Sequence, residues 1–331
     1  SSRSITSPAG TADTMEVLAD VSFSIKEMRR ILKSVNGCIV WGGALNLAPA
    51  DDKIINVERP LGIDAESQLI ASIMAKKLSV NSTHIIIDIP TGENSKIEDI
   101  CSAFCLKRRF EYIGRLLKRK IKVVITDGSE PIGNGVGPAL EARDILYILM
   151  RSDKRPLDLE KKSLMMAGHM LSMLGVRNGY KMAKEILDSG LAYKKMRDII
   201  RMQRGNPYIK PEDIKIGKYN FSFRAKKPGI IGCINNYSIS KIARIAGAPV
   251  DKSAGIFLYK HVGENVNNGD ILFTVYSESK EKLSYAEEII NEIEVVSVKK
   301  GQNSLRRGAK SPHTRDKIPS DFSQVMSKFG I

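Results

Sequence analysis

The sequence predicts an α/β protein followed, after about residue 205, by a separate α+β module. Two β-branched runs, at residues 84–89 and 121–126, each follow a helical pattern, and this alternation is typical of a parallel sheet covered by helices. After Asn206-Pro207 and Pro211, which mark a linker, short β-like runs replace the alternation. A chain of 331 residues is long enough for two or three domains of this kind.

The N-terminal half is predicted to contain helices, one short strand and a loop. Residues 15–35 have helical apolar spacing interrupted near Ser22–Ser24, and residues 38–41 form a short apolar run predicted as a buried strand. Residues 49–60 are predicted as a loop because they contain two prolines and two aspartates. The helices predicted before the two β-branched runs cover residues 65–78 and 97–119.

The C-terminal module is predicted to combine four short strands with two helices. The strands are expected at residues 219–224, 230–234, 255–259 and 271–276, and the helices at 238–246 and 281–292. The last thirty residues are polar, basic and without a period. We therefore expect residues 299–331 to be a poorly ordered tail.

The composition is that of an ordinary cytoplasmic protein. No apolar run approaches the roughly 20 residues that cross a bilayer, so no membrane partner is expected, and no signal peptide is visible. Four cysteines are too few for a disulfide framework, which favours a reducing compartment. Cys101 and Cys105 are four residues apart but lack a partner motif of His or Cys, so we expect buried structural thiols and no metal site.

The net charge of +15, from 52 basic and 37 acidic residues, suggests an anionic partner. Nucleic acid, a membrane surface and phosphorylated small molecules are the three candidates. The basic residues concentrate in residues 107–122 and 299–310, and a solvated face explains either run equally well. Aromatic residues are only 6% of the chain, so a surface that stacks nucleic-acid bases would depend on few side chains.

The opening residues 2–11 are rich in groups that hold phosphate. They contain five hydroxyl side chains and Arg3, and a helical pattern begins soon after them. Hydroxyls, guanidinium groups and backbone amides are common ligands of phosphate oxygens. The alternative is a frayed terminus that supplies only a helix cap.

A second group of polar residues lies on the helix predicted over residues 65–78. Asp64 is at its start, where a carboxylate commonly caps the free backbone amides. Ser72 and Lys76 are four residues apart and share one face. Together the three side chains could hold a heterocycle and donate a proton to it; otherwise they are a cap and a surface pair.

Two further motifs, residues 88–96 and 127–138, follow the predicted strands. Ligands of open α/β sheets bind outside the carboxyl ends of strands, where Lys96 is well placed for an anion. Residues 133–138 read G-x-G-x-G followed by proline, which is not the dinucleotide-binding G-x-G-x-x-G pattern. The sequence also has no P-loop lysine motif, so neither a dehydrogenase nor a P-loop enzyme is favoured.

These motifs resemble the thymidine phosphorylase family, most closely its archaeal AMP phosphorylase branch, from residue 1 to about 295. The matching segments are SSRSITSPAGTADTMEVL, CIVWGGALNLAPADDKII, the helix from Asp64 to Lys77, and GNGVGPALEARDIL. The resemblance implies a nucleoside phosphorylase fold: a large mixed-sheet α/β domain (1–50 and 80–205), a small helical domain that includes 51–79, and a C-terminal α+β domain (206–298). The active site would be the cleft between the first two domains, which closes on substrate.

The resemblance also implies an activity. It is that of a pentosyltransferase that converts AMP and inorganic phosphate to adenine and ribose 1,5-bisphosphate in nucleotide salvage or degradation. Phosphate would be a co-substrate and no cofactor is implied. The expected partners are nucleotide, phosphate and further copies of the chain in a homodimer or larger homo-oligomer, and neither nucleic acid nor a membrane is expected as a partner. It assigns proton donation to Asp64, base contacts to Arg59 and Lys76, and nucleotide or phosphate binding to Ser2, Arg3, Ser4, Ile5, Thr6, Ser7, Thr11, Ser72 and Lys96.

The chemistry places one requirement on Asp64. Breaking the glycosidic bond leaves negative charge on the base, so an acid that is protonated near neutral pH makes the base a better leaving group. An aspartate at a helix N-terminus normally has its charged form favoured. Asp64 can therefore act as the acid only where burial or neighbouring anions raise its pKa.

Several alternatives stay open on the sequence alone. Family members carry a segment before the residues that match here, including a glycine-bearing phosphate loop and most of the helical domain, and we expect this chain to lack it. An inactive truncated paralogue is therefore one alternative. A phosphorylase of thymidine or other pyrimidine nucleosides is another, and a basic nucleic-acid-binding protein is a third.

Overall fold

A parallel pair of strands, β1 (His84–Thr91) and β2 (Lys120–Asp127), is the sheet of the α/β part in the computed structural model. The structure describes residues 1–5, 7–45, 49, 53–54 and 66–299; residues 1–300 form one unit, and the second, 301–331, lies outside the described residues. The register runs from His84 opposite Lys120 to Thr91 opposite Asp127. Both predicted strands are thus confirmed, as is their parallel pairing.

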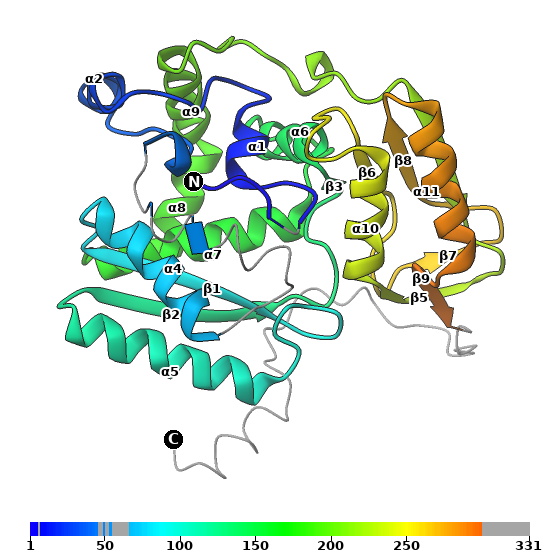
Figure 1. Ribbon diagram of the computed structural model, residues 1–331, viewed down its shortest axis with the longest axis horizontal. Coiled ribbons are helices and arrows are strands. Elements are labelled where there is room, and N and C mark those ends of the chain that lie inside the picture. The colour runs from blue at the N-terminus through cyan, green and yellow to red at the C-terminus, as the bar shows by residue number, and fades with distance from the viewer. Residues whose placement is uncertain (6, 46–48, 50–52, 55–65, 300–331) are drawn as a thin grey trace. The chain divides into compact units, whose positions relative to one another are not determined.

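Helices α4 (Glu66–Ser79) and α5 (Ile100–Leu116) share an apolar core with this strand pair (Figure 1). The buried residues are Ile70, Met74, Ile85, Ile87, Ile89, Ala103, Leu106, Phe110 and Val123. Both helices match the predicted ones within a few residues. Their apolar residues recur at helical spacing, which buries one stripe against the sheet and leaves the opposite face in solvent.

The expectation for Cys101 and Cys105 is wrong, because both thiols are exposed. The buried face of α5 is formed by Ala103, Leu106 and Phe110, and the two cysteines lie on the other face of the helix. Their spacing of four residues correctly predicted that the two cysteines lie on the same face of the helix. It could not say which face points to the core.

The N-terminal part contains α1 (Thr11–Met15), α2 (Ile25–Val35) and the 3-10 turn η1 (Gly42–Leu45). No strand forms over residues 38–41, so that prediction is wrong. The backbone of Ile39 bonds to a side chain instead: Gln203 is fully buried, accepts from Ile39 N at 2.8 Å and donates to Ile39 O at 2.9 Å. Trp41 N makes a single bond to Val21 O, at 2.8 Å. An apolar run indicates burial, whereas ladder pairing depends on the neighbours that the fold supplies.

Four helices between the parallel strands and the C-terminal module were not assigned from the sequence. They are α6 (Pro138–Leu149), α7 (Leu157–Met173), α8 (Gly179–Asp188) and α9 (Leu191–Met202). Helix α6 begins with proline at its first position, where the missing N–H costs nothing. Its Ala139, Ala142 and Leu146 pack with Met15 and Leu18 from and just after α1, so the N-terminal segment rests on α6.

The C-terminal module contains two antiparallel sheets and two helices. One sheet has the order β3-β6-β8-β4 and the other the order β7-β5-β9. The strands are β3 (Gly135–Val136), β4 (Tyr219–Arg224), β5 (Gly229–Ile234), β6 (Gly255–Leu258), β7 (Asn265–Val266), β8 (Ile271–Ser277) and β9 (Val296–Lys299), with α10 (Asn236–Ala246) and α11 (Lys280–Glu292). The four predicted strands and both predicted helices are confirmed.

Strand β3 ties the loop at residues 127–137 to this module. It pairs with β6, with Gly135 opposite Phe257 and Val136 opposite Ile256. Earlier in the same loop, Asn134 Oδ1 lies 3.0 Å from His261 Nε2. Val262 N donates to the Glu130 carboxylate, also at 3.0 Å. A loop at the carboxyl end of β2 is therefore fixed by residues more than a hundred positions later in the chain.

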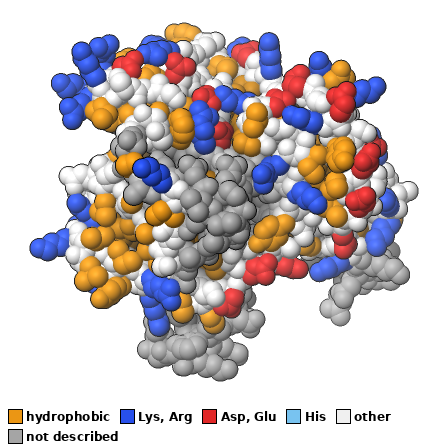
Figure 2. All heavy atoms as spheres, viewed as in Figure 1, with side chains coloured by type: hydrophobic (Ala, Val, Ile, Leu, Met, Phe, Trp, Pro, Cys, Tyr) orange, Lys and Arg blue, Asp and Glu red, His pale blue; other side chains and the backbone are white. Residues whose placement is uncertain are grey.

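Basic side chains are spread over several elements on the face of the molecule that Figure 2 shows. One group lies over α2, which carries Lys26, Arg29, Arg30 and Lys33, and other Lys and Arg side chains alternate with acidic and apolar ones. In the described part of the chain no helix is both long and apolar enough to span a membrane. Those residues also contain no cluster of three or more His, Cys, Asp or Glu that could hold a metal.

Candidate functional site

Asp13 organises the N-terminal segment. Its buried carboxylate accepts hydrogen bonds from Ser4 N at 2.7 Å, Gly10 N at 3.0 Å and the Arg3 guanidinium at 3.0 Å. These bonds fold residues 3–10 back over α1. A Cβ at Gly10 would lie 2.6 Å from Ser2 O and from the backbone of Arg3, so the close approach requires glycine.

Arg3 joins this loop to Glu16 at the end of α1, and Glu16 in turn binds the C-terminal module through Lys252. Its guanidinium donates two bonds of 2.7 Å to Glu16 and lies 4.7 Å above the Trp41 ring. Lys252 Nζ is 2.5 Å from the same Glu16 carboxylate. The hydrogen bond from Arg3 is the main reason that the pKa of Glu16 falls to about 2. Arg3 therefore acts here as an anchor of the segment.

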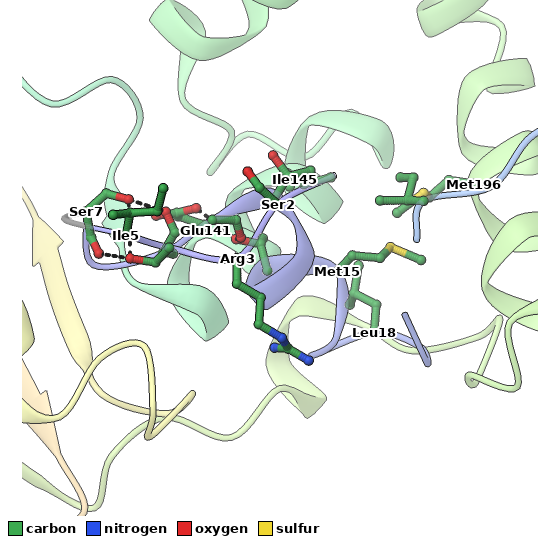
Figure 3. A pocket seen from close by; sticks show the side chains of 15 residues that line it. Ser2, Arg3, Ile5, Ser7, Met15, Leu18, Glu141, Ile145 and Met196 are labelled. Carbon is green, nitrogen blue, oxygen red and sulfur yellow. Dashed lines mark hydrogen bonds between the residues drawn. The ribbon is translucent and has the colours of Figure 1, made fainter. Parts of the chain in front are cut away.

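A cavity of about 570 Å³ lies against this segment (Figure 3). Its polar wall consists of the hydroxyl side chains of Ser2, Ser4, Ser7, Thr11 and Thr14, together with Arg3 and Glu141. Its apolar wall includes Ile5, Met15, Leu18, Ile39, Ile145 and Met196. A cavity with one apolar side and one side rich in hydroxyls suits a ligand that has a heterocycle and an anionic group.

Glu141 is the acidic side chain of this cavity and comes from the first turn of α6. Its carboxyl accepts hydrogen bonds from Thr14 Oγ1 at 2.9 Å and from Gly137 N at 3.2 Å. Burial raises the pKa of Glu141 to about 7 against the effect of these two bonds, and the negative charges of Asp144 and Asp13 add to the rise. Glu141 thus titrates near neutral pH.

Asp144, one turn later on α6, supports the loop before it. Its carboxylate is buried and accepts from Asn134 N and Gly135 N, at 2.7 Å each. Burial raises the pKa of Asp144 to about 6, although both hydrogen bonds favour its charged form. The segment GNGVGPALEARDIL therefore contains two carboxyl groups with raised pKa values. Sequence reasoning weighed only its glycines and missed both.

A second cavity, of about 350 Å³, brings Ser7 and Lys96 together. Its wall also contains Asp127, Gly128 and Glu130 from the loop after β2, and Lys162 from α7, which is 2.7 Å from Asp88 Oδ2. This is the carboxyl end of the parallel strand pair, the edge at which the sequence predicted a ligand. Ser7 lines both cavities, so they meet at the N-terminal segment.

The C-terminal module positions the loop that carries Lys96. Asn235 Nδ2 donates to Asn94 Oδ1 at 3.0 Å, and Tyr237 OH donates to Ser95 O at 3.2 Å. Asn94 itself has a positive φ of 61°, which asparagine tolerates better than most residues. Two residues at the start of α10 therefore hold the turn that precedes Lys96.

The other predicted site residues divide into two sets. Ser72 and Lys76 lie on α4, half-buried, and outside both cavities as the described residues outline them. Besides burial, the charges of Lys77 and Lys76 lower the pKa of the Ser1 amino group, so these lysines lie near the N-terminal segment. Thr6, Arg59 and Asp64 lie outside the described residues, as do residues 300–331.

Comparison with known proteins gives a consistent result. Residues 230–296 match the model of the pyrimidine nucleoside phosphorylase C-terminal domain. The chain is 52% identical over 289 residues to the AMP phosphorylase of Thermococcus kodakarensis, which covers 86% of this chain and 57% of that protein. It is 47% identical to the AMP phosphorylase of Thermofilum pendens, with 93% and 59% covered. It is also 46% identical to a putative thymidine phosphorylase of Bradyrhizobium diazoefficiens, with 84% and 54% covered.

The chain spans less than two thirds of the length of these relatives. The aligned region nevertheless extends well beyond the C-terminal domain, since it includes most of this chain. The similarity therefore includes most of the residues before the C-terminal domain as well as that domain itself.

Proposed function

Because the chain belongs to the family of AMP phosphorylases and thymidine phosphorylases, we propose that it is a pentosyltransferase that cleaves nucleoside 5′-monophosphates with inorganic phosphate. The observation that carries this proposal is the meeting of the two cavities at Ser7. One offers hydroxyl groups and an apolar wall, and the other offers Lys96 at the carboxyl end of β1. A nucleotide and a phosphate ion together bring two anionic groups and one heterocycle, which is the set that these walls suit.

The proposed reaction has one bond formed and one broken. A phosphate oxygen attacks C1′ of the ribose as the bond from C1′ to the base nitrogen breaks, and the base leaves with a proton. In this proposal the hydroxyl and amide groups of residues 2–11, Thr6 included, bind an anionic group, and Asp64 protonates the base. Arg59, Ser72 and Lys76 hold the nucleotide. Arg3 contributes mainly by holding the loop, because its guanidinium is bound by Asp13 and Glu16.

Lys96 supports a nucleotide substrate over a nucleoside. Its loop is held by Asn235 and Tyr237, so the cation is presented at a defined place beside Ser7. A cation carried by an anchored turn at the end of a strand favours a second anionic group, which AMP has and thymidine lacks. We propose AMP as substrate and, by analogy with the family, a homodimer or larger homo-oligomer. We also propose a cytoplasmic location, because nucleoside monophosphates are metabolites of that compartment.

The proposal is tested by measuring adenine release from AMP by chromatography, with and without inorganic phosphate, with thymidine as a parallel substrate. Release of adenine that requires phosphate, without cleavage of thymidine, is the expected result. The variant Lys96→Ala should raise the KM for AMP, whereas Lys107→Ala, which removes a cation from α5 that pairs with Glu111, should not.

Two other outcomes would contradict the proposal. Cleavage of thymidine at a rate equal to that of AMP would favour a nucleoside phosphorylase. No cleavage of either compound would mean that this chain is not a phosphorylase by itself, and salt-dependent binding to DNA of any sequence would then support the nucleic-acid-binding alternative.

A further inference from the structure

The hydroxyl group of Thr14 has one proton and two acceptors. Thr14 Oγ1 lies 2.9 Å from Glu141 Oε2 and 3.3 Å from Gly10 O. A hydroxyl can donate to only one of them at a time. If Glu141 is ionised, the Thr14 hydroxyl must donate to the carboxylate, and Gly10 O keeps only its bond from Thr14 N at 3.0 Å. If Glu141 is protonated, it donates to Thr14, and Thr14 donates to Gly10 O.

Protonation of Glu141 therefore frees the Thr14 hydroxyl to give Gly10 O a second hydrogen bond, beside the one that this carbonyl accepts from Thr14 N at 3.0 Å. Gly137 N donates to Glu141 Oε1 at 3.2 Å, Glu141 donates to Thr14, and Thr14 donates to the backbone of Gly10. Gly10 N is in turn bound by Asp13, and Gly10 lines the cavity next to Thr11. The chain of contacts runs from the first turn of α6 to the loop that carries the hydroxyl groups.

We propose that Glu141 is a positioning residue that must be protonated for the cavity to bind an anion. In its protonated form it holds Thr14 and Gly10 and adds no charge to the cavity wall. In its ionised form it takes the hydroxyl bond of Thr14 away from Gly10 O, which keeps the bond from Thr14 N, and it places a negative charge beside the ligand. This inference rests on the proposed function in one respect, namely that the cavity at residues 2–11 holds the anionic group of a substrate.

The charged groups around Glu141 do not compensate for its ionisation. From α1 it is faced by the carboxylate of Asp13, and on its own helix by that of Asp144. The nearby cations Arg3 and Lys252 are both bound to Glu16. The remaining elements packed around α6 present Glu212 at its far end, Asp158 and His261 near Asp144, and the neutral side chains Met196, Asn236 and Ser240. Arg143 of α6 itself is bound to Ile214 O. Burial together with the carboxylates of Asp144 and Asp13 raises the pKa of Glu141 to about 7, which puts the change in the physiological range.

The experiment measures the binding of sulfate by calorimetry at pH 6 and pH 8. Sulfate is the probe because it stays a dianion over this range, whereas phosphate itself titrates. If only the protonated form binds, wild-type affinity falls about tenfold from pH 6 to pH 8, since about one molecule in eleven is protonated at the higher pH. The variant Glu141→Gln imitates the protonated acid, because its amide donates to Thr14 and its carbonyl accepts from Gly137.

Glu141→Gln should therefore match the wild type at pH 6 and bind sulfate about tenfold more tightly than the wild type at pH 8. A residue with a merely structural role would give weaker or unchanged binding at both pH values. Glu212→Gln is the matched control, because it removes an exposed carboxylate from η2 (Pro211–Asp213) and should leave the wild-type pH dependence intact.

A second measurement does not depend on any ligand. The side-chain carboxyl of Glu141 is followed by carbon-13 NMR in glutamate-labelled protein, with Glu141→Gln used to assign the signal, and should titrate near pH 7. Three results would each overturn the proposal. They are titration of Glu141 in the ordinary range of glutamate, a sulfate affinity that depends equally on pH in Glu141→Gln and wild type, and no sulfate binding at either pH. Because none of these readouts is turnover, failure of the proposed phosphorylase activity would be seen separately, in the adenine assay.

Discussion

The N-terminal segment and the C-terminal module are held together by different kinds of interaction. Residues 2–16 are ordered by hydrogen bonds and ion pairs that centre on Asp13, Glu16 and Glu141. The C-terminal module is ordered by an apolar core in which Ile256, Phe273 and Val275 are completely buried. The stability that comes from apolar burial does not depend on pH, whereas the stability that comes from a network of charged groups does.

This difference fits the part that each region plays in the site. The C-terminal module contributes a stable surface from which Asn235 and Tyr237 fix the loop before Lys96. The N-terminal segment contributes the groups that line the cavity, and its polar contacts allow its shape to depend on protonation. The comparison predicts that changes in the two regions will differ in size and in pH dependence.

The largest expected effect is in the C-terminal core. Phe273 is fully buried and stacks on Phe223 with ring centroids 5.0 Å apart. Phe273→Ala should lower the free energy of unfolding by about 3–5 kcal/mol, because it removes buried apolar surface and leaves a cavity. Urea unfolding at pH 6 and pH 8 measures this loss, which should be equal at the two pH values. A loss under 1 kcal/mol would mean that the module is not held by this core.

The next effect is the pH dependence of stability from the acids near the N-terminal segment. The pKa of Glu141 is raised from 4.5 to about 7, so the stability it contributes is present below about pH 4.5 and is lost as pH rises through 7. Asp144 acts in the same direction, from 3.8 to about 6. The pKa of Glu16 is lowered to about 2, so its contribution is present above 4.5 and is lost as pH falls.

Glu141→Gln should consequently raise the free energy of unfolding by about 2 kcal/mol at pH 8 and change it little at pH 5. Thermal unfolding of both proteins between pH 4 and pH 9 would check the sign as well as the size. Stability of the wild type that rises steadily from pH 5 to pH 8, with no difference in the variant, would show that Glu141 ionises as an ordinary glutamate.

The smallest expected effect is at Arg3. Arg3→Lys keeps the charge but loses the two parallel bonds to Glu16 and the contact with the Trp41 ring, and should cost about 1 kcal/mol. Arg204→Lys, at an exposed pair with Glu27, is the matched control and should change stability by less than about 0.5 kcal/mol. Equal losses in the two variants would indicate that the half-buried position of Arg3 adds nothing to the strength of its pairs.

The sequence predicted the elements that have a clear period. Apolar spacing and turn residues predicted the strands β1 and β2, the helices α4 and α5, and, in the C-terminal module, the strands β4, β5, β6 and β8 and both helices. The short strands β3, β7 and β9 were not predicted. The candidate site was predicted as a set of motifs, and the fold brings Ser2, Arg3, Ser4, Ile5, Ser7 and Thr11 to one cavity and Ser7 and Lys96 to another. The roles of these residues and the domain boundaries stay predictions.

The sequence could not reveal contacts between distant residues. Residues 38–41 look like a strand, but the backbone of Ile39 is bound by Gln203, which is more than 160 positions away, and Trp41 N donates to Val21 O. Cys101 and Cys105 have the spacing of a shared helix face, but only packing of α5 on the sheet decided that this face is exposed. Glu141 is an ordinary glutamate in sequence until Thr14 and Gly137 are placed around it.

By itself, therefore, the sequence determined the α/β and α+β elements and the family to which the chain belongs, because periodicity and motifs are local and are written in consecutive residues. Only the tertiary structure decided which carboxyl groups are buried beside the cavity and which of them titrate near neutral pH. The physical reason is that desolvation and the placing of hydrogen-bond partners depend on neighbours in space, and for Glu141 those neighbours come from α1 and from the loop fixed by β3.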